Sequence, residues 1–243
     1  METIPRFFHP PSQSIFLFGP RGTGKSTWLK QQYPDAIYID LLSPDLFRLY
    51  SAEPERLMER IKGSPESNTI IIDEVQRVPE LLTVVHQIIE TSKSKIFILT
   101  GSSSRKLKRT GVDLLAGRAL VTSMHPFMAS ELDDGFHLTQ ALQDGLLPLV
   151  LNSRAPQATL DTYAALYLRE EVQMEGLVRN IGNFARFLET MSFSHGEVLN
   201  TSHIARECQV GRKTVEGYIE VLEDLLLGYR LQVFTKRAKR HLQ

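Results

Sequence analysis

Over roughly the first 135 residues, segments with the hydrophobic pattern of strands alternate with segments that have the pattern of helices. Short runs rich in Ile, Val and Phe are apolar on both faces, which is typical of strands buried on both sides in a parallel sheet. Between them lie stretches with helical spacing, such as 80–91, where Leu81, Val84 and Ile88 recur every three or four residues. Alternating strands and helices predict a doubly wound α/β domain. The predicted strands span residues 14–19, 36–40, 69–74, 95–100 and 119–123.

The pattern changes after about residue 130, where the strand-like runs stop. Residues 157–176 and 182–192 have the composition of helices. Farther along, residues 202–208 and a segment beginning at Lys213 predict two helices joined by a short turn. Residues 229–234 then predict a β-ribbon, which would complete a winged helix. We therefore expect an α/β domain at 1–135, a helical segment at 136–193 and a winged helix-turn-helix at 194–243.

The composition limits the classes of protein that fit. The 243 residues include 28 Lys and Arg against 28 Asp and Glu, and 42% are hydrophobic, which excludes a disordered chain. The apolar runs are far shorter than the roughly 18 residues that cross a bilayer, so we expect no membrane contact. The N-terminus lacks the pattern of a signal peptide, and Cys208 is the only cysteine. A reducing, cytoplasmic location fits these features best.

The most specific motif follows the first predicted strand. Residues 19–26, GPRGTGKS, match the phosphate-binding pattern G-x-x-x-x-G-K-[ST] at every fixed position. The glycines let the backbone approach phosphates, Lys25 reaches the β- and γ-phosphates, and the Ser26 hydroxyl binds Mg²⁺. A glycine-rich turn without a ligand is the alternative, which the flanking strand and helix disfavour. The predicted nucleotide-binding residues are Gly19, Pro20, Arg21, Gly22, Thr23, Gly24, Lys25, Ser26 and Thr27.

Two carboxylates end the third predicted strand. Asp73 and Glu74 follow three consecutive isoleucines, and ligands of α/β sheets bind at the carboxyl ends of the strands. We predict that Asp73 holds Mg²⁺ through its water shell and that Glu74 orients or deprotonates an attacking water. The alternative is that two acids merely end a strand. The phosphate-binding loop upstream favours the catalytic interpretation.

Further catalytic candidates follow the fourth strand and precede the fifth. Thr100 or Ser102 could place a hydroxyl beside the γ-phosphate, or could cap the next helix. Arg118 could stabilise a transferring phosphoryl group, within one subunit or across an interface, or could be an ordinary surface arginine. The basic cluster between these positions is interpreted as a solvated helix face. It comprises Arg105, Lys106, Lys108 and Arg109.

The nucleotide is predicted to be ATP. Neither N-K-x-D nor D-x-x-G, the guanine-nucleotide motifs, occurs in the sequence, and the transporter signature LSGGQ is also absent. A small-molecule kinase shares the same loop and stays an alternative. Glu74 argues against it, because a kinase gains nothing from a well-oriented water at the γ-phosphate.

The predicted winged helix leaves DNA binding open. Residues 201–243 carry eight basic and five acidic side chains, and the second helix starts with Arg212 and Lys213. Its later positions include Glu216 and Glu223, which phosphates repel. The basic C-terminal tail favours DNA, whereas the acidic helix face favours packing or protein contacts. We expect this segment to serve in packing or protein contacts and not in DNA binding.

With these residues in place, the chain resembles a known family. The stretches GPRGTGKST, IIIDEVQRVPELL, ILTGSSSRKL, LLAGRA and YLREEV are similar to segments of prokaryotic AAA-type ATP-binding proteins with a C-terminal region of unknown function. Members of that family usually continue past the winged helix into a nuclease-like domain, which would be missing here. The resemblance implies ATP at Lys25, Ser26 and Asp73, Glu74 as water activator, a sensor near Thr100 and a role for Arg118.

Two classes of function follow from these features. The first is an ATPase in which hydrolysis moves the helical parts against the phosphate-binding domain. The second is a nucleotide-gated binding module with little or no hydrolysis, and a DNA-binding regulator is a third. We expect ATP and an unidentified protein as partners, and the motifs are compatible with a homo-oligomer.

Overall fold

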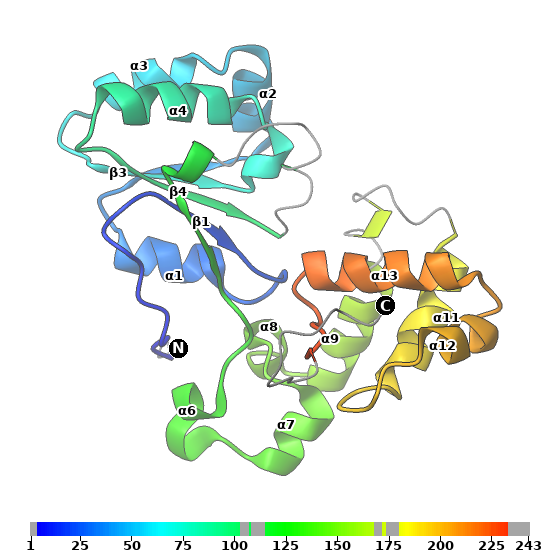
Figure 1. The fold of residues 1–243 in the computed structure, drawn as a ribbon. Coiled ribbons are helices and arrows are strands. Elements are labelled where there is room, and N and C mark those ends of the chain that lie inside the picture. The colour runs from blue at the N-terminus through cyan, green and yellow to red at the C-terminus, as the bar shows by residue number, and fades with distance from the viewer. Residues whose placement is uncertain (1–3, 103–106, 108–114, 168–171, 174–179, 233–243) are drawn as a thin grey trace, which may run out of the picture.

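The computed structural model describes residues 4–102, 107, 115–167, 172–173 and 180–232. Figure 1 shows two parts, a sheet covered by helices on both faces and an assembly of helices that contains the C-terminal elements. The predicted α/β class with a doubly wound parallel sheet is confirmed.

The sheet contains five strands in the order β2-β3-β4-β1-β5, and every neighbouring pair is parallel. All five fall where the apolar runs predicted them. Since β1 lies between β4 and β5, the chain reverses the direction of its winding there, which is the position where α/β sheets bind ligands. The strands are β1 (Ile15–Phe18), β2 (Ile37–Asp40), β3 (Thr69–Asp73), β4 (Ile96–Gly101) and β5 (Leu120–Ser123).

Helices cover the two faces of the sheet unequally. Because side chains alternate along a strand, Phe16 and Phe18 of β1 face one core cluster while Ile15 and Leu17 face another. In Figure 1, α2, α3 and α4 lie over one face and α1 over the other. The helices are α1 (Lys25–Gln32), α2 (Pro44–Ala52), α3 (Arg56–Lys62) and α4 (Leu81–Thr91), which matches the prediction for 80–91.

Short helices connect the sheet to the C-terminal part. The predicted helix over 157–176 begins as an α-helix and continues as a π-helical turn to Tyr167, and its remaining residues lie largely outside the described part of the chain. The connecting helices are α6 (Ala129–Leu132), α7 (Leu138–Asp144), α8 (Pro148–Leu151), α9 (Pro156–Thr162) and the π segment η4 (Tyr163–Tyr167). The 3₁₀ turns are η1 (Val75–Arg77), η2 (Leu115–Gly117) and η3 (Asp133–Gly135).

A second hydrophobic core joins α11 (Ile181–Ser192), α12 (Thr201–Glu207) and α13 (Arg212–Asp224). The rings of Phe184 and Phe187 each lie 5.2 Å from the ring of Tyr218, centroid to centroid. The side chains of Asn180 and Asn200 accept hydrogen bonds from the backbone amides of Asn183 and His203, and they thereby cap the first turns of α11 and α12. This core spans the predicted boundary between 193 and 194, and the division of the chain there stays a prediction.

The helix pair α12 and α13 lies where two helices joined by a turn were predicted, but the ribbon of a winged helix does not follow within the described residues. Residues 229–232 contain no strand, and Phe234 lies outside the described part, as do the basic tail and the cluster Arg105, Lys106, Lys108 and Arg109. A winged helix therefore remains a prediction.

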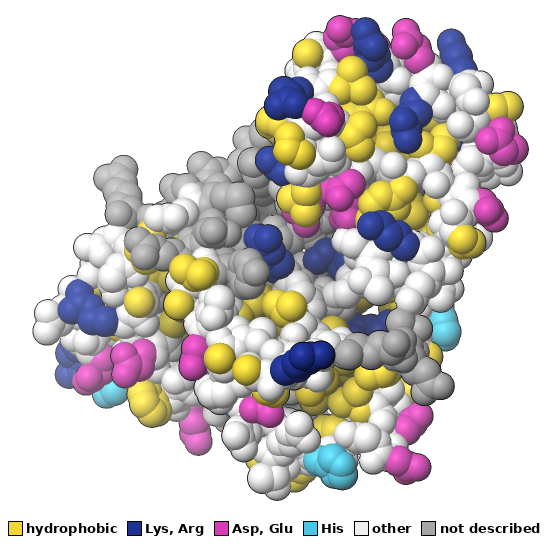
Figure 2. Space-filling model, turned by 180° about the vertical axis from the view of Figure 1, so that it is seen from behind, with side chains coloured by type: hydrophobic (Ala, Val, Ile, Leu, Met, Phe, Trp, Pro, Cys, Tyr) yellow, Lys and Arg dark blue, Asp and Glu magenta, His cyan; other side chains and the backbone are white. Residues whose placement is uncertain are grey.

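On the face shown in Figure 2, basic and acidic side chains are intermixed over the region of α2, α3 and α4. Exposed ion pairs occur within α2 and at the start of α3, such as Arg48 with Asp45 and Arg56 with Glu53, each at 2.5 Å. Among the described residues, no helix combines the length and the apolarity needed to cross a bilayer.

Candidate functional site

The predicted phosphate-binding loop connects β1 to α1 at the carboxyl edge of the sheet. Gly22 and Gly24 have φ values of 83° and 85°, a left-handed backbone that glycine adopts without strain. A side chain at Gly19 would place its Cβ atom 2.2 Å from the carbonyl oxygen of Met124. Each of these glycines therefore has a structural reason that is independent of any ligand.

The amino group of Lys25 lies inside this loop. Its Nζ atom donates to the carbonyl oxygens of Gly19 at 2.7 Å and Pro20 at 3.2 Å, and the side chain is buried. The Thr23 hydroxyl donates to the same Pro20 oxygen at 2.9 Å. A buried ammonium group needs such acceptors, and a phosphate oxygen is a stronger acceptor than a backbone carbonyl.

The other loop residues differ in exposure. Pro20 is buried, whereas Arg21 and Thr27 are exposed to solvent. Thr27 lies in the first turn of α1, directly after Ser26. The loop thus presents a buried lysine and an accessible helix start on the same short segment.

Asp73 is the centre of a buried hydrogen-bond network. Its side chain ends β3 and is only 3% exposed. The Ser26 hydroxyl donates to Oδ2 at 2.6 Å, the Tyr38 hydroxyl donates to the same oxygen, and the Thr100 hydroxyl donates to Oδ1. The predicted residues Ser26, Asp73 and Thr100 are therefore brought together by α1, β3 and β4.

Tyr38 was missed by the sequence analysis. It lies in β2, beside β3, and its hydroxyl reaches the carboxylate that ends the neighbouring strand. Burial raises the pKa of the Tyr38 phenol above its ordinary value, and the hydrogen bond to Asp73 raises this pKa further. The phenol is thus a proton donor and not a charged group at neutral pH.

Glu74 follows Asp73 and adopts an unusual backbone. Its φ of 62° lies in the left-handed region, which is rare for residues other than glycine. Its amide donates to Thr100 Oγ1 at 3.1 Å, and its carboxylate receives a hydrogen bond of 2.5 Å from the side-chain amide of Gln76. The predicted general base and the predicted sensor are therefore directly connected.

Gln76 is a second residue that the sequence analysis missed. Its side chain is 8% exposed, and within the described residues its Oε1 atom is buried without a hydrogen-bond partner. This oxygen lies only 2.5 Å from where a Cβ atom on Gly101 would stand. Glycine at position 101 thus leaves the room that the Gln76 amide occupies, and the NH₂ group of Gln76 faces Glu74.

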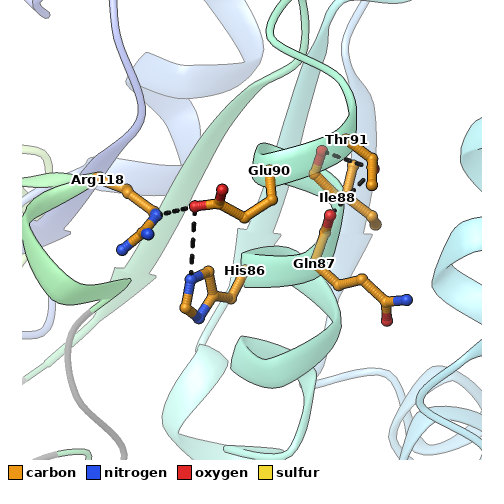
Figure 3. Close-up of polar contacts among 6 residues, drawn as sticks. All are labelled: His86, Gln87, Ile88, Glu90, Thr91 and Arg118. Carbon is orange, nitrogen blue, oxygen red and sulfur yellow. Dashed lines mark hydrogen bonds and ion pairs between the residues drawn. The ribbon is translucent and has the colours of Figure 1, made fainter.

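Arg118 lies away from the loop. It lies two residues before β5, and β5 runs parallel to β1, so Arg118 lies at the amino edge of the sheet while the loop leaves from the carboxyl edge. Its Nε atom donates to Glu90 at the end of α4, and His86 lies 3.7 Å from the same carboxylate (Figure 3). Within its own subunit Arg118 therefore lies at the edge of the sheet opposite the loop, and a catalytic role for it, within the subunit or across an interface, stays a prediction.

The helical part contacts the loop directly. The amide of Leu149 in α8 donates to the carbonyl oxygen of Gly22 at 3.2 Å. A Cβ atom on Gly22 would stand 3.0 Å from Cβ of Leu149, so glycine also permits this close approach. In addition, Leu226, just after α13, packs against the core under α2, α3 and α4. These contacts, among the described residues, join the sheet to the helices.

The donor set at Asp73 fits a magnesium ion bound together with a nucleotide. Mg²⁺ takes oxygen ligands, keeps several waters and is usually held by one or two protein groups plus phosphates. The Ser26 hydroxyl and the Asp73 carboxylate supply two oxygen donors 2.6 Å apart beside the loop. No group of three or more His, Cys, Asp or Glu side chains suited to a metal occurs among the described residues.

The fold and this loop define an α/β protein of the P-loop AAA class. The profile of the AAA domain family matches residues 11–133, about half of the chain, and the chain belongs to that family. A domain of unknown function, DUF8612, matches residues 135–243. The resemblance to AAA-type proteins with an uncharacterised C-terminal region is confirmed at this level, whereas a nuclease-like continuation is untested.

Curated relatives extend beyond this chain. An uncharacterized protein of Mycobacterium tuberculosis and one of Mycobacterium bovis are each 24% identical over 223 residues, covering 89% of this chain and 49% of the relative. The chain therefore spans about half the length of the curated relatives it matches.

Solved structures show a distant likeness. The ORC2 protein of Aeropyrum pernix in its ADP form is 14% identical, with a TM-score of 0.43 and coverage of 88% of this chain and 80% of that one. AMPPCP-bound DnaA from Aquifex aeolicus is 16% identical, with a TM-score of 0.38 and coverage of 89% and 83%. At these scores the likeness says nothing about activity.

Proposed function

We propose that the chain is an ATPase that binds ATP with Mg²⁺ and hydrolyses it to ADP and phosphate. The observation that carries this proposal is the contact between the Ser26 hydroxyl and the Asp73 carboxylate at 2.6 Å, next to Glu74 and beside the loop that holds Lys25. Membership in the AAA domain family supports the same conclusion.

The loop and the start of α1 would bind the phosphates. The amides of residues 22–27 and the positive end of the helix dipole favour anions, and Lys25 would exchange its two carbonyl acceptors for phosphate oxygens. Ser26 and Asp73 would hold Mg²⁺, which, when bound, neutralises charge on the β- and γ-phosphates. The exposed Arg21 and Thr27 are the remaining nucleotide contacts that we predict.

The chemical step would be attack of water on the γ-phosphorus. The bond from phosphorus to the bridging β–γ oxygen breaks, and the water proton passes to the Glu74 carboxylate. Glu74 is held for this task at two points, by its own amide on Thr100 and by Gln76 on its carboxylate. Thr100 links Asp73, the proposed Mg²⁺ ligand, to Glu74, the proposed base, because the Thr100 hydroxyl that accepts the Glu74 amide also donates to Asp73.

Hydrolysis would move the helices. The amide of Leu149 is bonded to Gly22 of the loop, so a change in loop geometry alters the position of α8. Leu149 contacts the loop and Leu226 packs against the core of the sheet, so both residues couple the nucleotide-binding part to the helices.

The test compares phosphate release by the wild type, Glu74→Gln and Lys25→Ala. Glu74→Gln should lose turnover by about 10²- to 10⁴-fold, the typical contribution of a general base, and keep ATP binding. Lys25→Ala should lose binding itself. Equal turnover in the wild type and Glu74→Gln would contradict the proposed mechanism, and wild-type protein that binds no ATP would contradict the function.

A nucleotide-gated binding module is the second candidate. The observation that favours it is the pairing of Arg118 with Glu90 at the far edge of the sheet, away from the loop of its own subunit. ATP binding with Mg²⁺ but without turnover, and an unidentified protein bound only in that state, would select this candidate.

DNA binding is not favoured by α13. Arg212, at the start of the helix, is paired with Glu216 at 2.9 Å, and Arg230 is paired with Glu223 at 2.6 Å. These arginines are already engaged by carboxylates on the same surface, and the carboxylates repel phosphates. A cytoplasmic location and a possible homo-oligomer remain expectations from the sequence.

A further inference from the structure

Tyr38 contacts the predicted metal carboxylate although no motif includes it. In the register of β2 and β3, Tyr38 lies opposite Ile71 and Asp40 lies opposite Asp73. Its side chain packs with the cluster on the α1 side of the sheet, which is also the side of Ser26. The ring therefore runs toward the carboxyl edge and brings its hydroxyl to Oδ2 of Asp73.

Two hydroxyl groups, those of Ser26 and Tyr38, donate to Oδ2 of Asp73, and we expect them to have different roles. The Ser26 hydroxyl is one of them, at 2.6 Å, and its oxygen would also have to face a metal ion. Oδ1 is held by Thr100, which in turn accepts the Glu74 amide. Tyr38 has no metal to face in this arrangement, although its hydroxyl also hydrogen-bonds with Ser26. Its phenol is therefore the donor that can stay on Oδ2 when Ser26 turns toward a metal.

The phenol is well suited to orient a carboxylate. A tyrosine ring has only two side-chain torsions, and this one is restrained by packing and by Lys30, whose Nζ lies 4.8 Å from the ring centroid. Hydrogen bonds from fixed donors set the plane of a carboxylate, and removal of a side chain that hydrogen-bonds to a metal ligand commonly lowers metal affinity by about 10- to 100-fold.

We propose that Tyr38 is a positioning residue of the Mg²⁺ site: its hydroxyl fixes the Asp73 carboxylate in the orientation that, with Ser26, receives the Mg²⁺ of the nucleotide. The inference rests on the proposed function and adds a residue to it. Tyr38 touches neither the nucleotide nor the attacking water in this account, and it acts through Asp73 and through its hydrogen bond with Ser26.

The test measures Mg²⁺-dependent nucleotide binding in Tyr38→Phe, which removes one oxygen atom and leaves the ring. Calorimetric titration with a non-hydrolysable ATP analogue over a series of Mg²⁺ concentrations gives the concentration that half-saturates the effect of the metal. We expect this concentration to rise by about 10-fold or more in the variant. Binding of the analogue in EDTA should be unchanged.

Tyr50→Phe is the matched control. Tyr50 is a buried tyrosine of α2 in the core on the opposite face of the sheet, so it reports the cost of losing a buried hydroxyl far from Asp73. Its Mg²⁺ dependence should match the wild type. Tyr38→Met, which also lacks the donor, repeats the test with different packing, and melting temperatures identify any variant that is not folded.

The outcomes separate the two proposals. If the wild type binds the analogue in a Mg²⁺-dependent manner and both Tyr38 variants show the same dependence, the inference about Tyr38 is wrong and the proposed function stands. If the wild type binds no nucleotide with or without Mg²⁺, both are wrong. A shift shared by Tyr38→Phe and Tyr50→Phe would also overturn the inference.

Discussion

The sheet and the C-terminal helices bury different kinds of side chain. Around the carboxyl edge of the sheet, polar groups are buried, among them Lys25, Asp73, Gln76 and Thr100. Among the described residues of 180–232, the buried set is apolar apart from the sulfur of Cys208 and the hydroxyl of Tyr218. The charged pairs of α13 lie on its surface instead.

The difference agrees with the region to which we assign the proposed chemistry. Burying a polar group without full compensation costs free energy, so such groups persist where a ligand requires them. Gln76, with its unpartnered Oε1, is the clearest case. The helices follow the opposite rule, because their stability depends on hydrophobic packing around Phe184, Phe187 and Tyr218.

The largest effect is expected in the helical core. Phe187 is fully buried, so Phe187→Ala should lower the free energy of unfolding of the helical part by about 3–5 kcal/mol. ATP binding by the sheet should persist. Chemical denaturation followed by circular dichroism measures the first, and titration with ATP measures the second.

The control for this change is Phe193→Ala, since Phe193 is 81% exposed and should contribute little. Loss of ATP binding in Phe187→Ala, but not in Phe193→Ala, would show that the two regions fold as one unit and would break the comparison.

An intermediate effect is expected at Gln76. Gln76→Met keeps the length of the side chain and removes the unpartnered buried oxygen, so the free energy of unfolding should change by less than about 1.5 kcal/mol. Turnover should fall about tenfold, because Glu74 loses a hydrogen bond worth about 1.4 kcal/mol. Denaturation curves and phosphate release give the two numbers.

Gln87→Met, on the exposed side of α4, is the matched control and should leave both quantities unchanged. A large loss of stability with normal turnover at Gln76 would reverse the interpretation and make this glutamine a structural residue.

The smallest effect is expected at the surface of α13. Hydrogen bonds from Arg230 hold the pKa of Glu223 below its ordinary value. The pair therefore stabilises the fold above the unfolded pKa of about 4.3 and loses this contribution as pH falls through the lower folded pKa. Because both side chains are partly exposed, the effect should be a few tenths of a kcal/mol.

Denaturation of the wild type and Glu223→Gln at a series of pH values from 7 to 3 measures this contribution. The two curves should converge at the acid end of the series. Glu197→Gln, at an exposed position, serves as control. A difference that grows as the pH falls would contradict the sign of the shift.

The sequence predicted most of the sheet because its strands are apolar on both faces. It also predicted the meeting of Ser26, Asp73 and Thr100, since strands that are parallel bring their carboxyl ends to one edge. For Arg118 the sequence left open a role within one subunit or across an interface. The same rule places it at the edge opposite the loop, because it precedes a strand parallel to β1.

Tyr38 and Gln76 could not be predicted, for different reasons. The contact of Tyr38 with Asp73 depends on the pairing of β2 with β3, which no local motif encodes. The contact of Gln76 with Glu74 depends on the 3₁₀ turn that follows β3 and on the left-handed backbone of Glu74. Alternating apolar positions carry no information about either of these.

At Glu74, the left-handed backbone lowers the stability of the fold, whereas the carboxylate is needed for the proposed hydrolysis. A side chain other than glycine in this conformation costs about 1–2 kcal/mol, which selection for stability alone would remove. Libraries of variants screened only for heat resistance should therefore drift from glutamate toward glycine or asparagine here, whereas libraries screened for turnover should retain the acid. The sequence preferred at this position thus becomes a record of which property has been under selection.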